Sequence, residues 1–568
     1  MSGLDWAVLL SVSLLIVGWG IWAGRGANQS SEAYLRGGSS QGWATIGLAV
    51  MATQASAITF LSVPGQAYED GMRFVQVYLG MPLALIVVSA VLAPAYHRMK
   101  VYTAYEILEK RFGVGARVLG ATLFLLQRGL AAGITLYAPA IILSALLGWS
   151  LEATVWAMGG TVVLYTVSGG AEAVAQTQKQ QMILMLAGIV VAAVVVAWRL
   201  PQGVGVGDAL HLAGTFGRLD AVRFNFDLSD RYNVWSGLLG GFFLSLAYFG
   251  TDQSQVGRYL GGKSLREIRI GLLFNGVLKI PMQALILLVG ALVFVFFLFE
   301  PPPLHFNQAL RDRAQHTAAA GELAQLDSTW LAQRGAVKQH AQAVVQARQA
   351  GNAAQLRLEQ AQLRQSQQQA EATRVQARSV IHRALPGSET KDSDYIFLHF
   401  VEHWFPPGLV GLLVAVILFA AMSSIAGELS ALGTTSALDL WRRLARPEAD
   451  GKALVAASRV FTVLWGGVAV GFASLASLLD NLIQAVNILG SLFYGTILGL
   501  FLAAFWLKRA SGRAVVVATL VAQGLVIGLF FASSLGFLWF NLVGCGLVLA
   551  LTEVLSLVWP RTASEVAV

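Results

Sequence analysis

Two long apolar stretches of the sequence are interrupted by small polar residues that could bind an ion. The first interruption, residues 52–60, carries hydroxyl and amide side chains and is soon followed by a Pro-Gly pair; the second, residues 420–427, contains Ser423 and Ser424. Backbone oxygens become available to an ion where a membrane helix breaks. Neutral carbonyl and hydroxyl oxygens suit a hard, singly charged cation. Alternatively, these hydroxyls only bond back to their own helices or join neighbouring helices.

The composition indicates that many helices cross a membrane. Only 12% of the 568 residues are charged and mean hydropathy is +0.63, whereas soluble chains average about 25% charged residues. The 59 glycines fit close packing of membrane helices. A span needs about 20 apolar residues. Thirteen apolar runs are expected to be spans, and they lie near 5–24, 42–66, 73–96, 117–147, 151–168, 180–200, 234–253, 268–300, 408–433, 454–478, 482–507, 514–533 and 535–558.

Several function classes are excluded. The formal charge of +8 comes from basic residues in short loops between apolar runs, which argues against nucleic-acid binding. The single cysteine, Cys545, lies in an apolar run, so one chain holds no disulfide framework or zinc cluster. No nucleophile constellation, metal cluster or phosphate-binding loop appears, and we expect no enzymatic activity.

Basic residues predict the orientation in the membrane. They cluster in the short loops after the third, seventh, ninth and eleventh runs, as at residues 98–117, 258–269, 442–452 and 508–513, so all these loops lie on one side. By the positive-inside rule these loops are cytoplasmic. We therefore expect a multi-pass protein of the inner (plasma) membrane with its N-terminus outside and its C-terminus in the cytoplasm. The first run lacks the features of a cleaved signal peptide and is read as a retained helix.

Residues 301–392 form a polar segment that interrupts the apolar pattern. It is rich in Gln, Ala and Arg, and residues 351–352 (Gly-Asn) form a natural turn between two helix-forming stretches. We expect an extracytoplasmic helical hairpin that is dispensable for transport. It is either a docking surface for an external protein or a solvated structural insertion.

Three charged residues lie inside apolar runs: Arg128, Lys279 and Glu428. Each costs at least about 2.5 kcal/mol in a membrane unless it is paired or hydrated. Either Lys279 or Arg128 attracts an anionic substrate and Glu428 tunes the field at the ion site, or these groups pair with each other or reach toward the interface.

Five motifs in order resemble the sodium:solute symporter family. They are YTAYEIL at 102–108, SGGAEAV at 168–174, YFGTDQ at 248–253, FNGVLKIP at 274–281 and AAMSS at 420–424. The run SAITFLSVP at 56–64 is most similar to the branch that moves iodide, vitamins and monocarboxylates. The resemblance covers the apolar runs but not the insertion.

The resemblance implies an all-α polytopic membrane protein with about 13 transmembrane helices and a leucine-transporter-like, five-plus-five inverted repeat. The first repeat would occupy about 42–200, and the second would run from about 234 to about 507. The expected divisions are residues 1–300 with helices 1–8, the insertion at 301–392, and residues 393–568 with helices 9–13. Such a protein is expected to work as a monomer in the lipid bilayer.

The resemblance also implies the site residues. The Na⁺ ligands would be the backbone oxygens of Ala52, Ala55 and Ala420 and the hydroxyls of Ser423 and Ser424. The substrate would contact residues on several helices, with Tyr248 as an inner gate. These substrate-binding candidates are Gln54, Ser56, Thr59, Tyr78, Tyr137, Ser245 and Lys279.

Two departures from the family pattern concern a second sodium site. Gln178 stands where many members have an aspartate, and Ala426 and Gly427 stand where two-sodium members have hydroxyls. The expected activity is therefore symport of one Na⁺ with each small solute, with a small organic or inorganic anion as the favoured class. Proton-coupled transport, and a transporter-like sensor that signals through the external hairpin, remain as alternatives.

Overall fold

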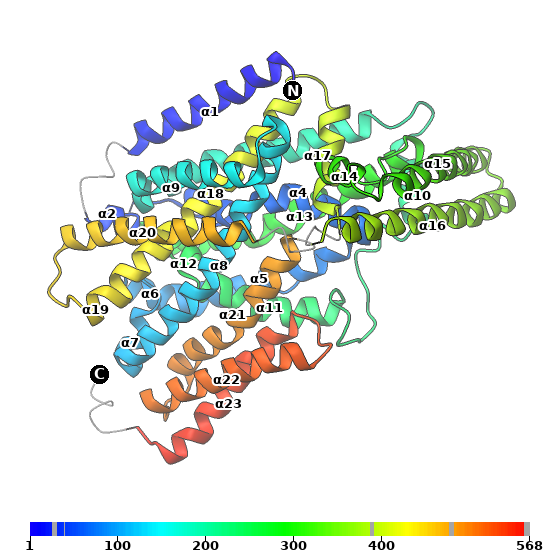
Figure 1. Ribbon diagram of the computed structural model, residues 1–568. Coiled ribbons are helices and arrows are strands. Elements are labelled where there is room, and N and C mark those ends of the chain that lie inside the picture. The colour runs from blue at the N-terminus through cyan, green and yellow to red at the C-terminus, as the bar shows by residue number, and fades with distance from the viewer. Residues whose placement is uncertain (25–30, 39, 387–390, 476–481, 562–568) are drawn as a thin grey trace.

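The protein is a bundle of helices in the computed structural model, which describes residues 1–24, 31–38, 40–386, 391–475 and 482–561. In these residues every regular element is a helix, and an isolated bridge joins Gln41 to Gly262. By length and composition, nine described stretches could cross a membrane. One of them, Ala57–Met99, runs from the second expected span into the third, and two shorter apolar helices cover Gly3–Leu15 and Ser236–Thr251. Helical segments thus lie at all thirteen expected positions (Figure 1).

The first half of the chain contains the first six expected spans. Two of these spans are joined in α9, where Gly170 at φ 64 marks a kink between them. The elements are α1 (Gly3–Gly24), α2 (Ser31–Arg36), α3 (Trp43–Gln54), α4 (Ala57–Asp70), η2 (Gly71–Tyr78), α5 (Met81–Val87), η3 (Val88–Leu92), α6 (Ala93–Met99), α7 (Glu106–Phe112), α8 (Val114–Leu147), α9 (Leu151–Trp198) and α10 (Val206–Thr215).

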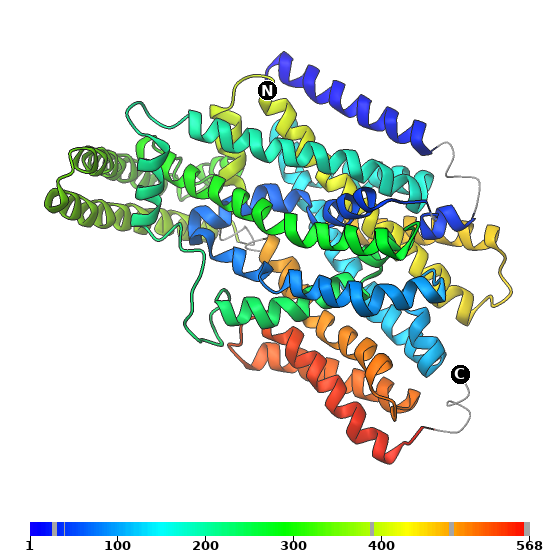
Figure 2. The ribbon, with the colours of Figure 1, turned by 180° about the vertical axis from the view of Figure 1, so that it is seen from behind.

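The second half contains the remaining spans and the insertion. α1 flanks one side of the bundle, and α22 and α23 flank the other (Figures 1 and 2). The elements are η4 (Ser236–Gly240), α11 (Gly241–Thr251), α12 (Gln253–Leu260), α13 (Leu265–Phe299), α14 (Gln308–Gln315), α15 (Ala320–Gln349), α16 (Ala353–Ala384), α17 (Ser393–Trp404), α18 (Leu409–Thr435), η5 (Ser436–Trp441), α19 (Arg442–Leu444), α20 (Gly451–Ala473), α21 (Leu482–Trp506), α22 (Gly512–Ala532) and α23 (Trp539–Val558).

Two glycines, which have no side chain, let α4 pack tightly between α13 and α17. A Cβ atom on Gly65 would overlap the carbonyl of Ser393 at the start of α17. A Cβ atom on Gly290 of α13 would likewise overlap the carbonyl of Pro64. Backbones this close leave no room for rearrangement, so the two glycines fix the position of α4.

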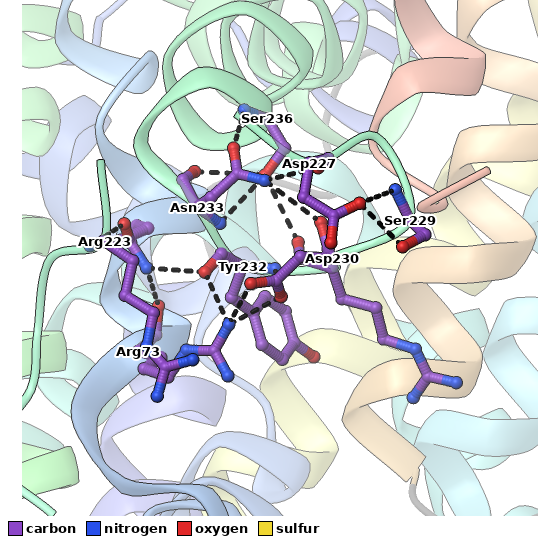
Figure 3. A network of polar contacts seen from close by, with 10 residues as sticks. Arg73, Arg223, Asp227, Ser229, Asp230, Tyr232, Asn233 and Ser236 are labelled. Carbon is purple, nitrogen blue, oxygen red and sulfur yellow. Dashed lines mark hydrogen bonds and ion pairs between the residues drawn. The ribbon is translucent and has the colours of Figure 1, made fainter. Parts of the chain in front are cut away.

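The loop before η4 is held in shape by polar contacts rather than by regular structure (Figure 3). Arg73 of η2 forms an ion pair with Asp230 at 2.5 Å and also donates to the Tyr232 carbonyl at 3.0 Å. Gln76 donates to the same carbonyl at 2.9 Å and accepts from the Arg223 N–H at 2.9 Å. These bonds join the loop before η4 to η2, whose Val77 and Tyr78 line the central cavity described below.

The insertion is a pair of long helices that project from one end of the bundle (Figures 1 and 2). The helices α15 and α16 are joined by a turn in which Gly351 adopts φ 68, a conformation that favours glycine. The base of the pair packs on the bundle: the Arg334 guanidinium donates to the Phe297 carbonyl of α13, and Val337 belongs to the same apolar cluster as Phe297.

Buried charges also join the insertion to the bundle. Arg374 and Arg378 of α16 form ion pairs with Asp392 at 2.8 and 2.7 Å, and Arg378 pairs with Glu69 of α4 at 2.9 Å. Although burial opposes ionisation of Asp392, the nearby arginine charges hold the pKa of this carboxyl well below its usual range. The insertion therefore supplies counter-charges that the bundle cannot replace.

We expect Gly65→Ala to destabilise the protein because the new methyl group would collide with the Ser393 carbonyl. Overpacking of this kind typically costs about 1–3 kcal/mol. Gly335→Ala in α15 meets nothing within 4 Å, so it should instead stabilise the protein by up to about 1 kcal/mol through helix propensity. Thermal unfolding of the purified variants would measure both changes, and equal melting temperatures would contradict the packing argument.

Candidate ion and substrate site

The polar interruption at residues 52–60 is a break between α3 and α4. Ala55 has ψ 83 and Ser56 is extended, so the helix stops at Gln54 and restarts at Ala57. In a continuous helix the Ser56 N–H would bond the Ala52 carbonyl, but here it donates to the Gln54 carbonyl at 3.2 Å. The Ala52 carbonyl accepts the hydroxyl of Ser424 from α18 at 3.3 Å. The break therefore faces the serine pair.

The oxygens at this break fit a bound cation. Ala52, Ala55, Ala420, Ser423 and Ser424 are all buried, at 0–1% exposure. Among the described residues the Ser423 hydroxyl has no hydrogen-bond partner. A buried hydroxyl left without a partner costs free energy. A cation bound to a lone pair of the Ser423 oxygen would supply that partner. The set contains only neutral oxygens, as a singly charged hard ion prefers.

Gln178 of α9 occupies the other side of the serine pair. Its side-chain amide donates to the Ser423 carbonyl at 3.0 Å and to the Thr53 hydroxyl at 3.1 Å. Gly427 lies against this amide, since a Cβ atom there would stand 3.3 Å from the Gln178 nitrogen. The position where an aspartate would stand thus presents an N–H donor, which repels a cation, toward the serine helix.

A cavity of about 100 Å³ adjoins the break. Five of the residues expected at the substrate site or gate line it: Gln54, Ser56, Tyr78, Ser245 and Tyr248. The other three candidates, Thr59 of α4, Tyr137 of α8 and Lys279 of α13, are buried but do not line this cavity.

The sequence reasoning missed the contribution of α21 to the cavity. Ile483, Val486, Asn487, Gly490 and Tyr494 line one wall. The sequence does contain a pattern that indicates this wall: Asn487 is a polar residue within an apolar run, and two small residues, Gly490 and Ser491, follow it. Thr53 and Thr135 were also missed; each hydroxyl bonds back to its own helix, to the Ala49 and Ala131 carbonyls.

A buried ion-pair network closes one side of the cavity. Arg128 of α8 forms ion pairs with Asp252 at the α11–α12 junction and with Glu428 of α18, the latter at 3.1 Å. Tyr494 donates to Asp252 at 2.8 Å. The expectation that Arg128 and Glu428 pair with each other is thus confirmed. Two carboxylates against one guanidinium leave the network with an excess negative charge.

Tyr248 lies beside this network, and Arg128, Glu428 and Tyr494 line the same cavity as Tyr248 does. The Arg128 guanidinium lies 5.3 Å from the centre of its ring, and the Tyr494 ring is 5.8 Å away. Its hydroxyl accepts from the Gln255 amide at 2.6 Å.

Lys279 is a fully buried cation without a carboxylate partner in the described part of the chain. Its ammonium has no hydrogen-bond partner there, and it lies 5.5 Å from the centre of the Tyr78 ring. Tyr78 lines the cavity, so one aromatic ring separates this charge from the cavity.

Comparison with known proteins decides the family. The profile of the sodium:solute symporter family matches residues 34–298 and 375–521. The chain belongs to the sodium:solute symporter family. Residues 299–374 lie outside the match, so the profile includes the last part of the expected insertion, residues 375–392.

Similar members of the family belong to the expected branch. The human sodium/iodide cotransporter is 31% identical over 299 residues, which are 52% of this chain and 45% of that protein. The mouse sodium-coupled monocarboxylate transporter 1 is 27% identical over 501 residues, which are 88% of this chain and 68% of that protein. A putative sodium-dependent multivitamin transporter of Drosophila melanogaster is 32% identical over 47% of this chain and 44% of that protein. The chain thus spans less than half of the length of the iodide and multivitamin relatives.

The fold is shared with a solved symporter structure. A Na⁺-coupled sialic acid symporter superposes with a TM-score of 0.74 at 20% identity, and the match covers 98% of both chains. The expected all-helical polytopic transporter fold is therefore confirmed.

We expect Arg128→Met to destabilise this family member more than Asp252→Asn does. The first change leaves two buried carboxylates unpaired, which typically costs about 3–5 kcal/mol. After the second change Arg128 keeps Glu428 as its partner. Thermal unfolding of the purified variants in detergent would compare them. A larger loss of stability in Asp252→Asn would mean that the guanidinium is not the centre of the network.

Proposed function

We propose that this protein is a Na⁺-coupled symporter that moves one Na⁺ with each molecule of a small anion. The observation that carries the proposal is the α3–α4 break, whose Ala52 carbonyl lacks its usual helix partner and faces the serine pair of α18. Neutral buried oxygens with one unsatisfied hydroxyl fit Na⁺. Membership in a sodium-coupled family supports the same ion.

Bound Na⁺ would join the two halves of the inverted repeat. Ala52 and Ala55 belong to α3 and its end, whereas Ala420, Ser423 and Ser424 belong to α18. An ion held by both elements stabilises the conformation in which they are close together, so it shifts the population toward that state. The solute would bind in the adjoining cavity against Gln54, Ser56, Tyr78 and Ser245, and Tyr248 would act as the gate.

An anionic solute is supported by the charges around the cavity as well as by the relatives' names. Arg128 is already occupied by two carboxylates, so it has little capacity left for a substrate. Lys279 is a buried charge that still needs a counter-ion, and Tyr78 is all that separates it from the cavity. We therefore assign anion attraction to Lys279 rather than to Arg128.

The orientation of the protein in the membrane is inferred from the position of its basic loops. α6 and α19, which carry basic residues, lie at the end of the bundle opposite to α15 and α16 (Figure 1). If the basic end faces the cytoplasm, the insertion is extracytoplasmic. The N-terminus is then outside and the C-terminus inside, in the inner (plasma) membrane. We propose that the monomer is the working unit.

Proton coupling is the second candidate, and Glu428 favours it. This residue lines the cavity, and one of its carboxylate oxygens has no partner among the described residues. Uptake driven by a pH gradient without Na⁺ would establish proton coupling; an absolute requirement for Na⁺ at every pH would exclude it.

We predict that Ser424→Ala raises the Na⁺ concentration for half-maximal uptake about tenfold or more, because one ion ligand is lost. The assay is uptake of labelled iodide or propionate into proteoliposomes. Ser430→Ala changes another buried hydroxyl further along α18 and should leave the Na⁺ dependence unchanged. An unchanged half-saturation in Ser424→Ala would refute the assignment.

We predict that uptake of a monovalent anion does not respond to membrane voltage. One Na⁺ with one monovalent anion moves no net charge, whereas a second Na⁺ would add about 2.3 kcal/mol per 100 mV. The Gln178 amide fills the position where a second ion would need a carboxylate. Proteoliposomes with and without an imposed potassium diffusion potential make the comparison. Uptake that increases with an inside-negative potential would show that a second Na⁺ is carried.

A further inference from the structure

A second cavity, of about 420 Å³, lies where the insertion meets the bundle. Its walls come from α16, from the end of α4, from the residues that follow α10 and from the last turns of α13. None of its lining residues lines the central cavity. The two cavities are therefore separate sites.

Arginine side chains dominate this second cavity. Arg218, Arg364, Arg374 and Arg378 line it together with two glutamates. Both glutamates have basic partners: Glu69 pairs with Arg378 at 2.9 Å, and Glu371 lies 3.9 Å from Arg374.

Two of the four arginines form no ion pair in the described part of the chain. Arg374 and Arg378 pair with the acids at this wall, which are Glu69, Glu371 and the adjoining Asp392. Arg218 and Arg364 form no ion pair among the described residues, although the nearby acids act on Arg218 at longer range. Four arginines against three acids leave one positive charge in excess.

Both free guanidinium groups are held in place. Arg218 stacks on the Phe294 ring with its central carbon 4.6 Å from the ring centre. Arg364 donates through Nε to the Thr215 carbonyl at 2.9 Å, which leaves its two terminal nitrogens available. Tyr68 and Phe216 add apolar wall next to these charges. A low-dielectric wall strengthens the field of a charge, and a fixed guanidinium loses little entropy on binding.

We propose that this cavity is a binding site for a small soluble oxyanion that carries at least two negative charges, such as a phosphate or a di- or tricarboxylate. Guanidinium groups bind such ions through paired N–H···O bonds. The side-chain amides of Gln367 and Gln368 line the same cavity and supply further donors. A cavity of this volume, with a wall built largely by α16 of the polar insertion, suits a free ion rather than an extended chain.

The position of the site connects it to the transport machinery. Glu69 in its wall is the penultimate residue of α4, the helix that follows the break at Ala55 and Ser56. A bound anion would strengthen the attachment of α16 to this end of α4. The site would therefore stabilise one arrangement of α4 and the insertion.

Isothermal titration of the full-length protein with citrate and with inorganic phosphate tests the proposal. The protein is kept in a zwitterionic detergent at constant ionic strength, with chloride as the monovalent comparison ion. We expect saturable binding of one citrate or phosphate ion and no comparable binding of chloride. Arg218→Gln and Arg364→Gln should each weaken this binding about tenfold or more, because each removes a charge-assisted hydrogen bond.

Arg357→Gln is the matched control, since Arg357 is exposed on the same helix α16 and does not line the cavity. This variant should bind within twofold of the unmodified protein, and all variants should keep its melting temperature and Na⁺ dependence. Absence of saturable binding would overturn the proposal, as would equal weakening by Arg357→Gln. Loss of binding in Lys279→Met but not in Arg218→Gln would place the anion in the central cavity and would also overturn it.

Discussion

The need to satisfy every polar backbone group inside a membrane governs this structure. A helix that breaks in the hydrocarbon region exposes carbonyl oxygens, and each one costs free energy unless it finds a partner. The break at Ala55 and Ser56 is tolerated because α18 brings a hydroxyl to the Ala52 carbonyl. The same requirement makes the break suitable for the proposed cation site, since an ion would satisfy several such oxygens at once. Fold stability and ion coupling thus arise from one constraint.

The charged groups beside the central cavity also need partners, and leaving a buried charge unpaired costs more free energy than leaving a carbonyl unpaired. Arg128, Asp252 and Glu428 stabilise one another only as a group, and their excess negative charge lies beside a proposed Na⁺ site and a proposed anion site. A positive ion at the serine pair lowers the cost of that excess charge. If Na⁺ binds at the serine pair and an anion binds in the cavity as proposed, each would favour binding of the other, which is the coupling that symport requires.

The sequence predicts those parts of the site that depend on local pattern. Small polar residues inside apolar runs indicate the break in the second span and the serine pair in the ninth, and both features are present in the fold. The sequence could not show which helices meet across the cavity. Asn487 and Tyr494 entered the lining because α21 packs against α8 and α11, a long-range contact that no local pattern encodes. Arg128 illustrates the same limit: its need for a partner was evident, but Asp252 as a second partner depends on the fold.

The insertion shows that a local sequence pattern can predict helices without predicting the ion pairs that they form. Its polar composition predicts a helical hairpin outside the membrane, and the expectation that transport does not need it assumes a separable appendage. However, Arg374 and Arg378 provide the ion pairs of the fully buried Asp392 carboxylate. Asp392 is the last residue of the 301–392 segment, so a deletion that removes α15 and α16 but keeps Asp392 would leave this charge without its arginine partners. The penalty of several kcal/mol would fall on the residue immediately before α17, next to the tight contact between Ser393 and Gly65. A deletion combined with Asp392→Asn removes that penalty. Only this combined variant separates a direct role of the hairpin in transport from its role as a counter-charge for the bundle.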